Sequence, residues 1–122
     1  MIVVVDLLFQ SRIRAAADAL GLDARVADSA AASHVAIAAS PALVVIDLDA
    51  AGIDVPATIR AAREAGAKVL AFGRHTEALA LRAAREAGAD PVVARSQLAE
   101  ELPELLAGLA GIDPNGQHRD GG

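Results

Sequence analysis

Short apolar runs alternate along the chain with longer segments in which apolar residues recur every three or four positions. Residues 2–5 and 43–46 are unbroken runs of Ile, Val and Leu. They are too short for helices and are typical of strands buried on both faces of a parallel sheet. Residues 68–72 and 91–94 have a similar character, and residues 23–27 form a weaker segment with one Val between polar residues. The pattern therefore predicts five strands.

The segments between these runs predict five helices. In the first of them, Ile13, Ala16, Ala17 and Leu20 fall on one helical face. Pro103 lies inside the last, which predicts a kink or a late helix start there, because proline cannot donate the helical hydrogen bond. The expected helices cover residues 10–20, 30–39, 56–65, 77–87 and 97–109.

Polar residues stand where three of the helices are expected to begin. A side-chain oxygen at this position can accept a hydrogen bond from a free backbone N–H of the first turn. The expected caps are Asp28 or Ser29 for the second helix, Asp54 or Val55 for the third, and Thr76 for the fourth.

An eight-residue sequence, Arg-Ala-Ala-Arg-Glu-Ala-Gly-Ala, occurs at residues 60–67 and again at residues 82–89. Each copy ends a predicted helix, supplies a glycine that stops it and leads into a strand, so we interpret the copies as equivalent helix–strand units. Strands that alternate with helices form right-handed crossovers and a parallel sheet. We therefore predict an α/β fold, namely a flavodoxin-like, doubly wound, five-stranded parallel sheet in the order 2-1-3-4-5 with five helices in a three-layer sandwich.

The length of 122 residues is enough for one domain with one core, which we place at residues 1–110. Residues 111–122 combine Gly, Pro, Asn and charged residues with little to bury, which predicts a disordered tail. There is no Cys, which excludes disulfides and thiolate ligands. The net charge of −5 argues against nucleic acid as a partner, since phosphate binding needs a basic surface. The N-terminal apolar run lacks the basic flank of a signal peptide and is too short to cross a membrane, so a cytoplasmic location is expected.

Two acidic residues directly follow buried strands, Asp6 after the first and Asp47 after the third. The carboxyl ends of parallel strands meet at one edge of a sheet, where open α/β folds place their sites. Arg95 follows the fifth strand, so we expect it at the same edge and within reach of Asp47. The histidines, which show no metal-ligand spacing, are His34, His75 and His118.

Taken together, residues 2–109 resemble a response-regulator receiver domain. The residues that carry the resemblance are Val-Val-Val-Asp ending at Asp6, Arg12, the run at residues 43–52, the run at residues 80–90, and Val-Val-Ala-Arg ending at Arg95. The resemblance implies a phospho-accepting Asp after the third strand and a pair of acids after the first that hold Mg²⁺. It also implies a Thr or Ser after the fourth strand and a Lys after the fifth.

Carried over by position, the resemblance makes Asp47 the phospho-acceptor equivalent and Asp6 the first acid. Leu7 stands at the position of the second acid, Gly73 at that of the Thr or Ser, and Arg95 at that of the Lys. The positions of the family's aromatic switch residue and of the proline after the Lys hold Val92 and Ser96.

These departures weaken the implied metal site, because Mg²⁺ prefers several carboxylate oxygens in octahedral geometry and Leu7 offers none. No cofactor and no metal are expected; Asp6 and Asp47 are weak candidates, and Mg²⁺ is expected only if the site functions. Two interpretations of Asp47 stay open, namely retained chemistry and a structural carboxylate that pairs with Arg95.

We therefore interpret the chain as a pseudo-receiver rather than an enzyme. Such a non-catalytic module of a bacterial two-component-like regulatory system would act by protein–protein contact without standard aspartyl phosphorylation. The expected contact face combines the fourth helix, the fifth strand and the fifth helix, and it would bind a protein partner or a second copy, but neither nucleic acid nor a membrane. Its candidate residues are Leu79, Leu81, Leu98, Leu102, Leu105 and Leu106.

Two alternatives remain. The first is a phosphorylatable single-domain response regulator with Asp47 as acceptor. The second is a small-ligand-binding flavodoxin-like domain that uses the same crevice.

Overall fold

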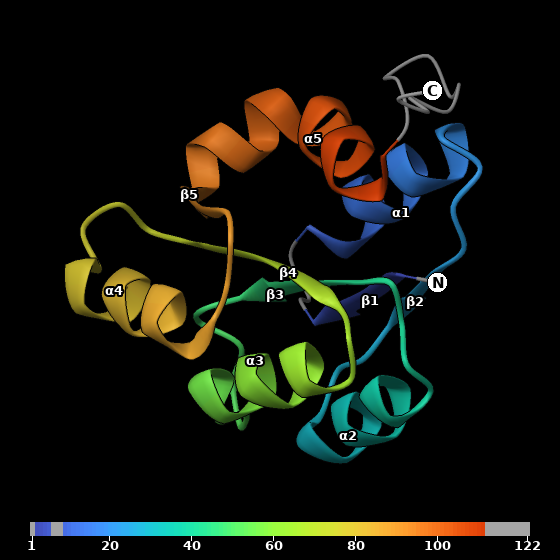
Figure 1. Cartoon of the computed structure of the whole chain (residues 1–122). Helices are drawn as coiled ribbons and strands as arrows, with labels where there is room; N and C mark the ends of the chain where they lie inside the picture. Colours follow the sequence, from blue (N-terminus) through green and yellow to red (C-terminus); the bar gives the residue numbers. More distant parts are fainter. Residues whose placement is uncertain (1, 6–8, 112–122) are drawn as a thin grey trace.

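The computed structural model describes residues 2–5 and 9–111, which form a parallel sheet flanked by helices (Figure 1). The strands are β1 (Ile2–Val5), β2 (Ala24–Val26), β3 (Leu43–Asp47), β4 (Lys68–Gly73) and β5 (Val92–Ala94). The helices are α1 (Gln10–Ala19), α2 (Ala30–Ala38), α3 (Val55–Glu64), α4 (Ala78–Ala87) and α5 (Arg95–Ala110). The strand order is β2-β1-β3-β4-β5, and every pairing is parallel. This confirms the predicted flavodoxin-like α/β fold.

Each face of the sheet is covered by its own helices, because successive residues of a strand point to opposite faces. Helices α1 and α5 pack on one face, against residues such as Val4 and Phe72 (Figure 1). Helices α2, α3 and α4 pack on the other, against residues such as Val44 and Ile46. Strands β1 and β3 are buried along their whole length, as their unbroken apolar runs predicted.

Two of the predicted helix caps are confirmed and one is wrong. Ser29 and Asp54 each accept a hydrogen bond from the backbone N–H three residues further on, at 3.0 Å and 3.1 Å. Thr76 does not cap α4, because the residue before this helix is Glu77, which makes no side-chain capping hydrogen bond. The chain turns there instead, and the Glu77 N–H donates to the carbonyl of Arg74 at 2.9 Å.

Helix α5 starts directly after β5, at Arg95, and it is kinked. Glu101 has non-helical backbone angles (φ −116°, ψ 20°) two residues before Pro103, which confirms the predicted kink and excludes a late start. Pro103 has no N–H for the Ala99 carbonyl four residues earlier. Arg12 of α1 donates to this carbonyl from its Nη2 atom at 3.2 Å. The arginine therefore joins the two helices at the point where the helical hydrogen bond is missing.

The repeated octapeptide forms two similar units, α3–β4 and α4–β5, as the sequence predicted. Both glycines have positive φ, +92° at Gly66 and +114° at Gly88, which favours glycine at these helix ends. Their surroundings differ, because a Cβ atom at Gly88 would lie 3.1 Å from Cγ of Arg63, whereas one at Gly66 would meet nothing within 4 Å. Arg63 of the first copy thus lies against Gly88 of the second.

The predictions for Asp6, Leu7 and residues 112–122 of the tail lie outside the described residues. None of the described helices is long and apolar enough to cross a membrane.

Candidate functional site

Asp47 is the last residue of β3, which lies between β1 and β4 in the sheet. Parallel pairing places Phe72 of β4 directly beside it. The chain leaves β4 at Gly73 and β5 at Ala94, followed at once by Arg95. As predicted, the structure brings Asp47, Gly73 and Arg95 to the same edge of the sheet.

A single guanidinium nitrogen holds the Asp47 carboxylate. The Nη2 atom of Arg95 lies 3.1 Å from Oδ1 and 3.3 Å from Oδ2 of Asp47. The same nitrogen lies 3.2 Å from Oδ2 of Asp49. The Asp49 backbone N–H also donates to Oδ1 of Asp47 at 2.9 Å. Both oxygens of Asp47 are therefore engaged by neighbouring donors.

The ion pairs continue outward to a fourth residue, Arg74, whose Nε lies 3.4 Å from Oδ2 of Asp49. We call Asp47, Arg95, Asp49 and Arg74 the charge chain. Side-chain exposure rises from 6% at Asp47 to 22% at Arg95, 39% at Asp49 and 62% at Arg74. Coulomb attraction weakens as water surrounds a pair, so the inner pair contributes most to the energy of this group.

An apolar contact lies beside the charge chain. A Cβ atom built on Gly73 would lie 3.0 Å from Cδ1 and 3.2 Å from Cβ of Leu48. The Leu48 N–H donates to the carbonyl of Phe72 at 2.9 Å, which fixes this backbone next to β4. Gly73, the position at which the resemblance implies a Thr or Ser, is therefore covered by a leucine.

These described side chains do not fit a magnesium ion. Both carboxylates that meet here, Asp47 and Asp49, face the positive guanidinium of Arg95, which repels a second cation. No group of three or more His, Asp or Glu side chains converges within residues 2–5 and 9–111. Asp6 lies outside these ranges.

The sequence analysis did not identify the roles of Leu48, Asp49 and Arg74. Asp49 bridges the two arginines. The signal for the role of Leu48 is its position between two acids in the sequence. Because neighbouring residues of an extended segment point to opposite sides, an apolar residue here is expected to point away from both carboxylates. Arg74 directly follows Gly73, at the edge where a cation next to Asp49 could have been anticipated.

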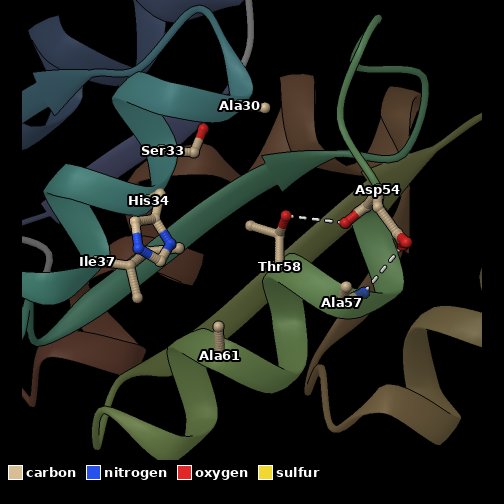
Figure 2. A pocket seen from close by; sticks show the side chains of 8 residues that line it. All are labelled: Ala30, Ser33, His34, Ile37, Asp54, Ala57, Thr58 and Ala61. Carbon is tan, nitrogen blue, oxygen red and sulfur yellow. Dashed lines mark hydrogen bonds between the residues drawn. The ribbon is translucent and has the colours of Figure 1, made fainter.

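The remaining candidates do not join this site. Val92 is half-buried in β5, His75 is exposed after β4, and His34 is exposed on α2. The described hollows also lie away from the crevice. One of about 210 Å³ lies between α2 and α3, next to His34 and the capping residue Asp54 (Figure 2).

The chain matches no protein-family model and no curated protein. Solved structures do match it. The receiver domain of NtrX from Brucella abortus is 18% identical, covers 89% of this chain and 97% of its own length, and superposes with a TM-score of 0.76.

Two further structures match over a similar length. A two-component response regulator from Clostridium difficile is 13% identical, with coverage of 89% and 92% and a TM-score of 0.75. A CheY-like receiver domain protein from Methanospirillum hungatei JF-1 is 16% identical, with coverage of 89% and 94% and a TM-score of 0.70. From its strand order, the placement of Asp47 and these likenesses, the chain has the fold of a response-regulator receiver domain.

Proposed function

We propose that this chain is a pseudo-receiver, a non-catalytic module of a two-component-like regulatory system that works through protein contact. The observation that carries the proposal is the charge chain, in which Arg95 occupies both oxygens of Asp47. The contact between Leu48 and Gly73 supports it independently.

Transfer of a phosphoryl group to Asp47 would need a carboxylate oxygen that can approach phosphorus in line. It would also need positive groups placed around the three equatorial phosphoryl oxygens. Here the cation lies on the carboxylate itself, and no hydroxyl stands at position 73 to bind the transferred group. Arginine presents a rigid planar fork, which adapts less readily than the point charge of lysine.

The proposed contact surface combines α4, β5 and α5. Among the six candidate leucines, Leu98, Leu102 and Leu106 are buried in the core, whereas Leu79 is 81% exposed. Arg82, three positions after Leu79 on α4, is exposed, and α5 carries exposed glutamates, so the surface presents charges of both signs. An apolar centre with a charged border is the usual composition of a protein-binding surface.

The phosphorylation part of the proposal is tested by ¹H–¹⁵N NMR with Mg²⁺ and then beryllofluoride, which mimics an aspartyl phosphate. We expect no slow-exchange shifts at the amides of Asp47, Gly73 and Arg95. Such shifts, absent from Asp47→Asn, would instead establish a phosphorylatable regulator with Asp47 as acceptor. A receiver domain known to bind beryllofluoride serves as the control for the reagent.

The contact part is tested with a photo-crosslinking amino acid at Leu79 in the native host. The matched control position is Arg14, an exposed residue on α1. We expect a discrete adduct with another protein from position 79 and none from position 14. Equal labelling from both positions, or none from position 79, would contradict this surface.

A further inference from the structure

Helix α2 differs from the other described helices because it carries no charge. No Asp, Glu, Lys or Arg occurs anywhere in residues 29–46, whereas each of the other four helices carries at least three. A helix that is apolar all round is normally buried on all sides. Only Ser33 and Ile37 of α2 are buried, and Val35 is 70% exposed.

Two hollows flank this helix. The larger, of about 430 Å³, lies between α2 and β2. It is lined by Arg25, Val26, Ala31, Ala32, Val35, Ala36 and Ala39. The smaller, of about 210 Å³, separates α2 from α3, where only short side chains such as Ala57, Thr58 and Ala61 stand opposite (Figure 2). Helix α2 is therefore an apolar ridge with a hollow on either side.

We infer that α2 docks a second copy of this chain through a two-fold contact of α2 with α2. A ridge beside an apolar hollow complements itself, because in a two-fold interface the same surface serves both partners. The ridge centred on Val35 in one copy would fill the larger hollow of the other. Ala31 and Ala39, one turn before and after Val35, are small enough to allow close approach of the two helices.

The lack of charge on α2 and around its larger hollow favours a second copy of this chain as the partner that binds there. The chain carries a net charge of −5, so two copies repel each other wherever their acidic surfaces meet. Arg25 is the single charged residue that lines the larger hollow, and its Nε lies 3.8 Å from a carboxylate oxygen of Asp23. This surface is therefore neutral, and its best match is an equally uncharged apolar helix. Among the described helices α2 alone meets that requirement.

This inference is separate from the proposed function, which uses another exposed residue, Leu79 of α4. Val35 and Leu79 are the two large apolar side chains that are exposed in the described part of the chain. Helix α4 places Arg82 three positions after Leu79, which suits a charged partner, whereas α2 carries no Asp, Glu, Lys or Arg beside Val35. The two residues therefore make a matched pair of test positions.

The experiment is sedimentation equilibrium of the full chain over a wide concentration range, for the wild type, Val35→Glu and Leu79→Glu. Both substitutions place a carboxylate at an exposed position, and circular dichroism checks that both variants fold. We expect the wild type and Leu79→Glu to approach twice the 12.3 kDa monomer mass, and Val35→Glu to stay monomeric. A monomeric wild type, or a dimer that Val35→Glu leaves intact, overturns the inference. A dimer that only Leu79→Glu dissociates places the contact on α4 and overturns it as well.

Two further measurements test the same inference without the Val35→Glu variant. The chain has no native cysteine, so Val35→Cys can be oxidised to test whether two α2 helices meet. We expect a disulfide-linked dimer from Val35→Cys and not from Leu79→Cys at the same concentration. In wild-type NMR spectra, concentration-dependent shifts should concentrate on α2 and β2, and shifts concentrated on α4 and α5 would contradict the inference.

Discussion

Asp47, Leu48 and Asp49 are consecutive, yet they are held by contacts of opposite kinds. The two acids share the guanidinium of Arg95, while the leucine between them packs over Gly73. The ionic contact joins two carboxylates to one cation. The apolar contact covers a position that has no side chain of its own. The comparison teaches that one end of β3 is stabilised both by neutralised charge and by packing.

The largest expected effect is that of Asp47→Ala, which tests the ionic contact. Removing the carboxylate leaves Arg95 largely buried with only the half-exposed Asp49 to pair with. Breaking a buried pair from one side is strongly destabilising, and we expect a loss of about 2–3 kcal/mol in the free energy of unfolding. Urea unfolding measures this loss.

The sign of this change is the decisive readout. In an acidic site without a neutralising partner, removing one carboxylate relieves repulsion and raises stability. A stabilised Asp47→Ala variant would therefore show that Arg95 does not neutralise the crevice in solution. Asp54→Ala, which removes a helix cap outside the crevice, is the control for loss of a carboxylate.

Gly73→Thr tests the apolar contact by adding a side chain with a hydroxyl at this position. The new Cβ would lie 3.0 Å from Leu48, so the leucine must move, and we expect a cost of about 1–3 kcal/mol. Leu48→Ala should remove this penalty, so that Gly73→Thr costs less in the double variant than in the wild type. Equal costs in both backgrounds, measured by urea unfolding, would mean that the two residues do not compete for space.

Arg95→Met sharpens the comparison by removing the cation and keeping a long side chain. The Nε of Arg95 is buried without a hydrogen-bond partner among the described residues, so its removal also eliminates an unsatisfied donor. The two carboxylates left behind should then attract Mg²⁺. We expect stabilisation of about 1 kcal/mol at a Mg²⁺ concentration about five times its dissociation constant.

Thermal unfolding with Mg²⁺, compared with NaCl of the same ionic strength, measures this response. The wild type and Arg95→Lys, which both keep a cation, should show none. Mg²⁺-dependent stabilisation of the wild type would contradict the neutralised crevice, and so would the absence of any response in Arg95→Met.

The smallest effect is expected from Arg74→Gln at the exposed end of the charge chain. The pair between Arg74 and Asp49 lies mostly in water, where an ion pair contributes about 0–1 kcal/mol. We expect a loss below about 0.5 kcal/mol that disappears at high salt, because salt screens exposed charges. A loss as large as that of Asp47→Ala would show that the exposed pair of Arg74 and Asp49 stabilises the fold as much as the buried pair of Asp47 and Arg95.

The sequence by itself determined the architecture and many of its local details. The apolar runs at residues 2–5 and 43–46 predicted the buried strands β1 and β3, and Ser29 and Asp54 cap helices through bonds to residues only three positions away. The kink before Pro103 follows from the chemistry of proline alone. Asp47 and Arg95 were placed together because parallel strands present their carboxyl ends at one edge.

Only the tertiary structure decided which side chains share contacts across the edge of the sheet. Arg95 lies 46 and 48 positions away from its two carboxylates, and no local pattern fixes distances over such separations. Thr76 failed as a cap because the preceding turn delayed α4 until Ala78. Leu48 covers Gly73 because two neighbouring strands end side by side, which brings a loop residue against a position that has no side chain of its own.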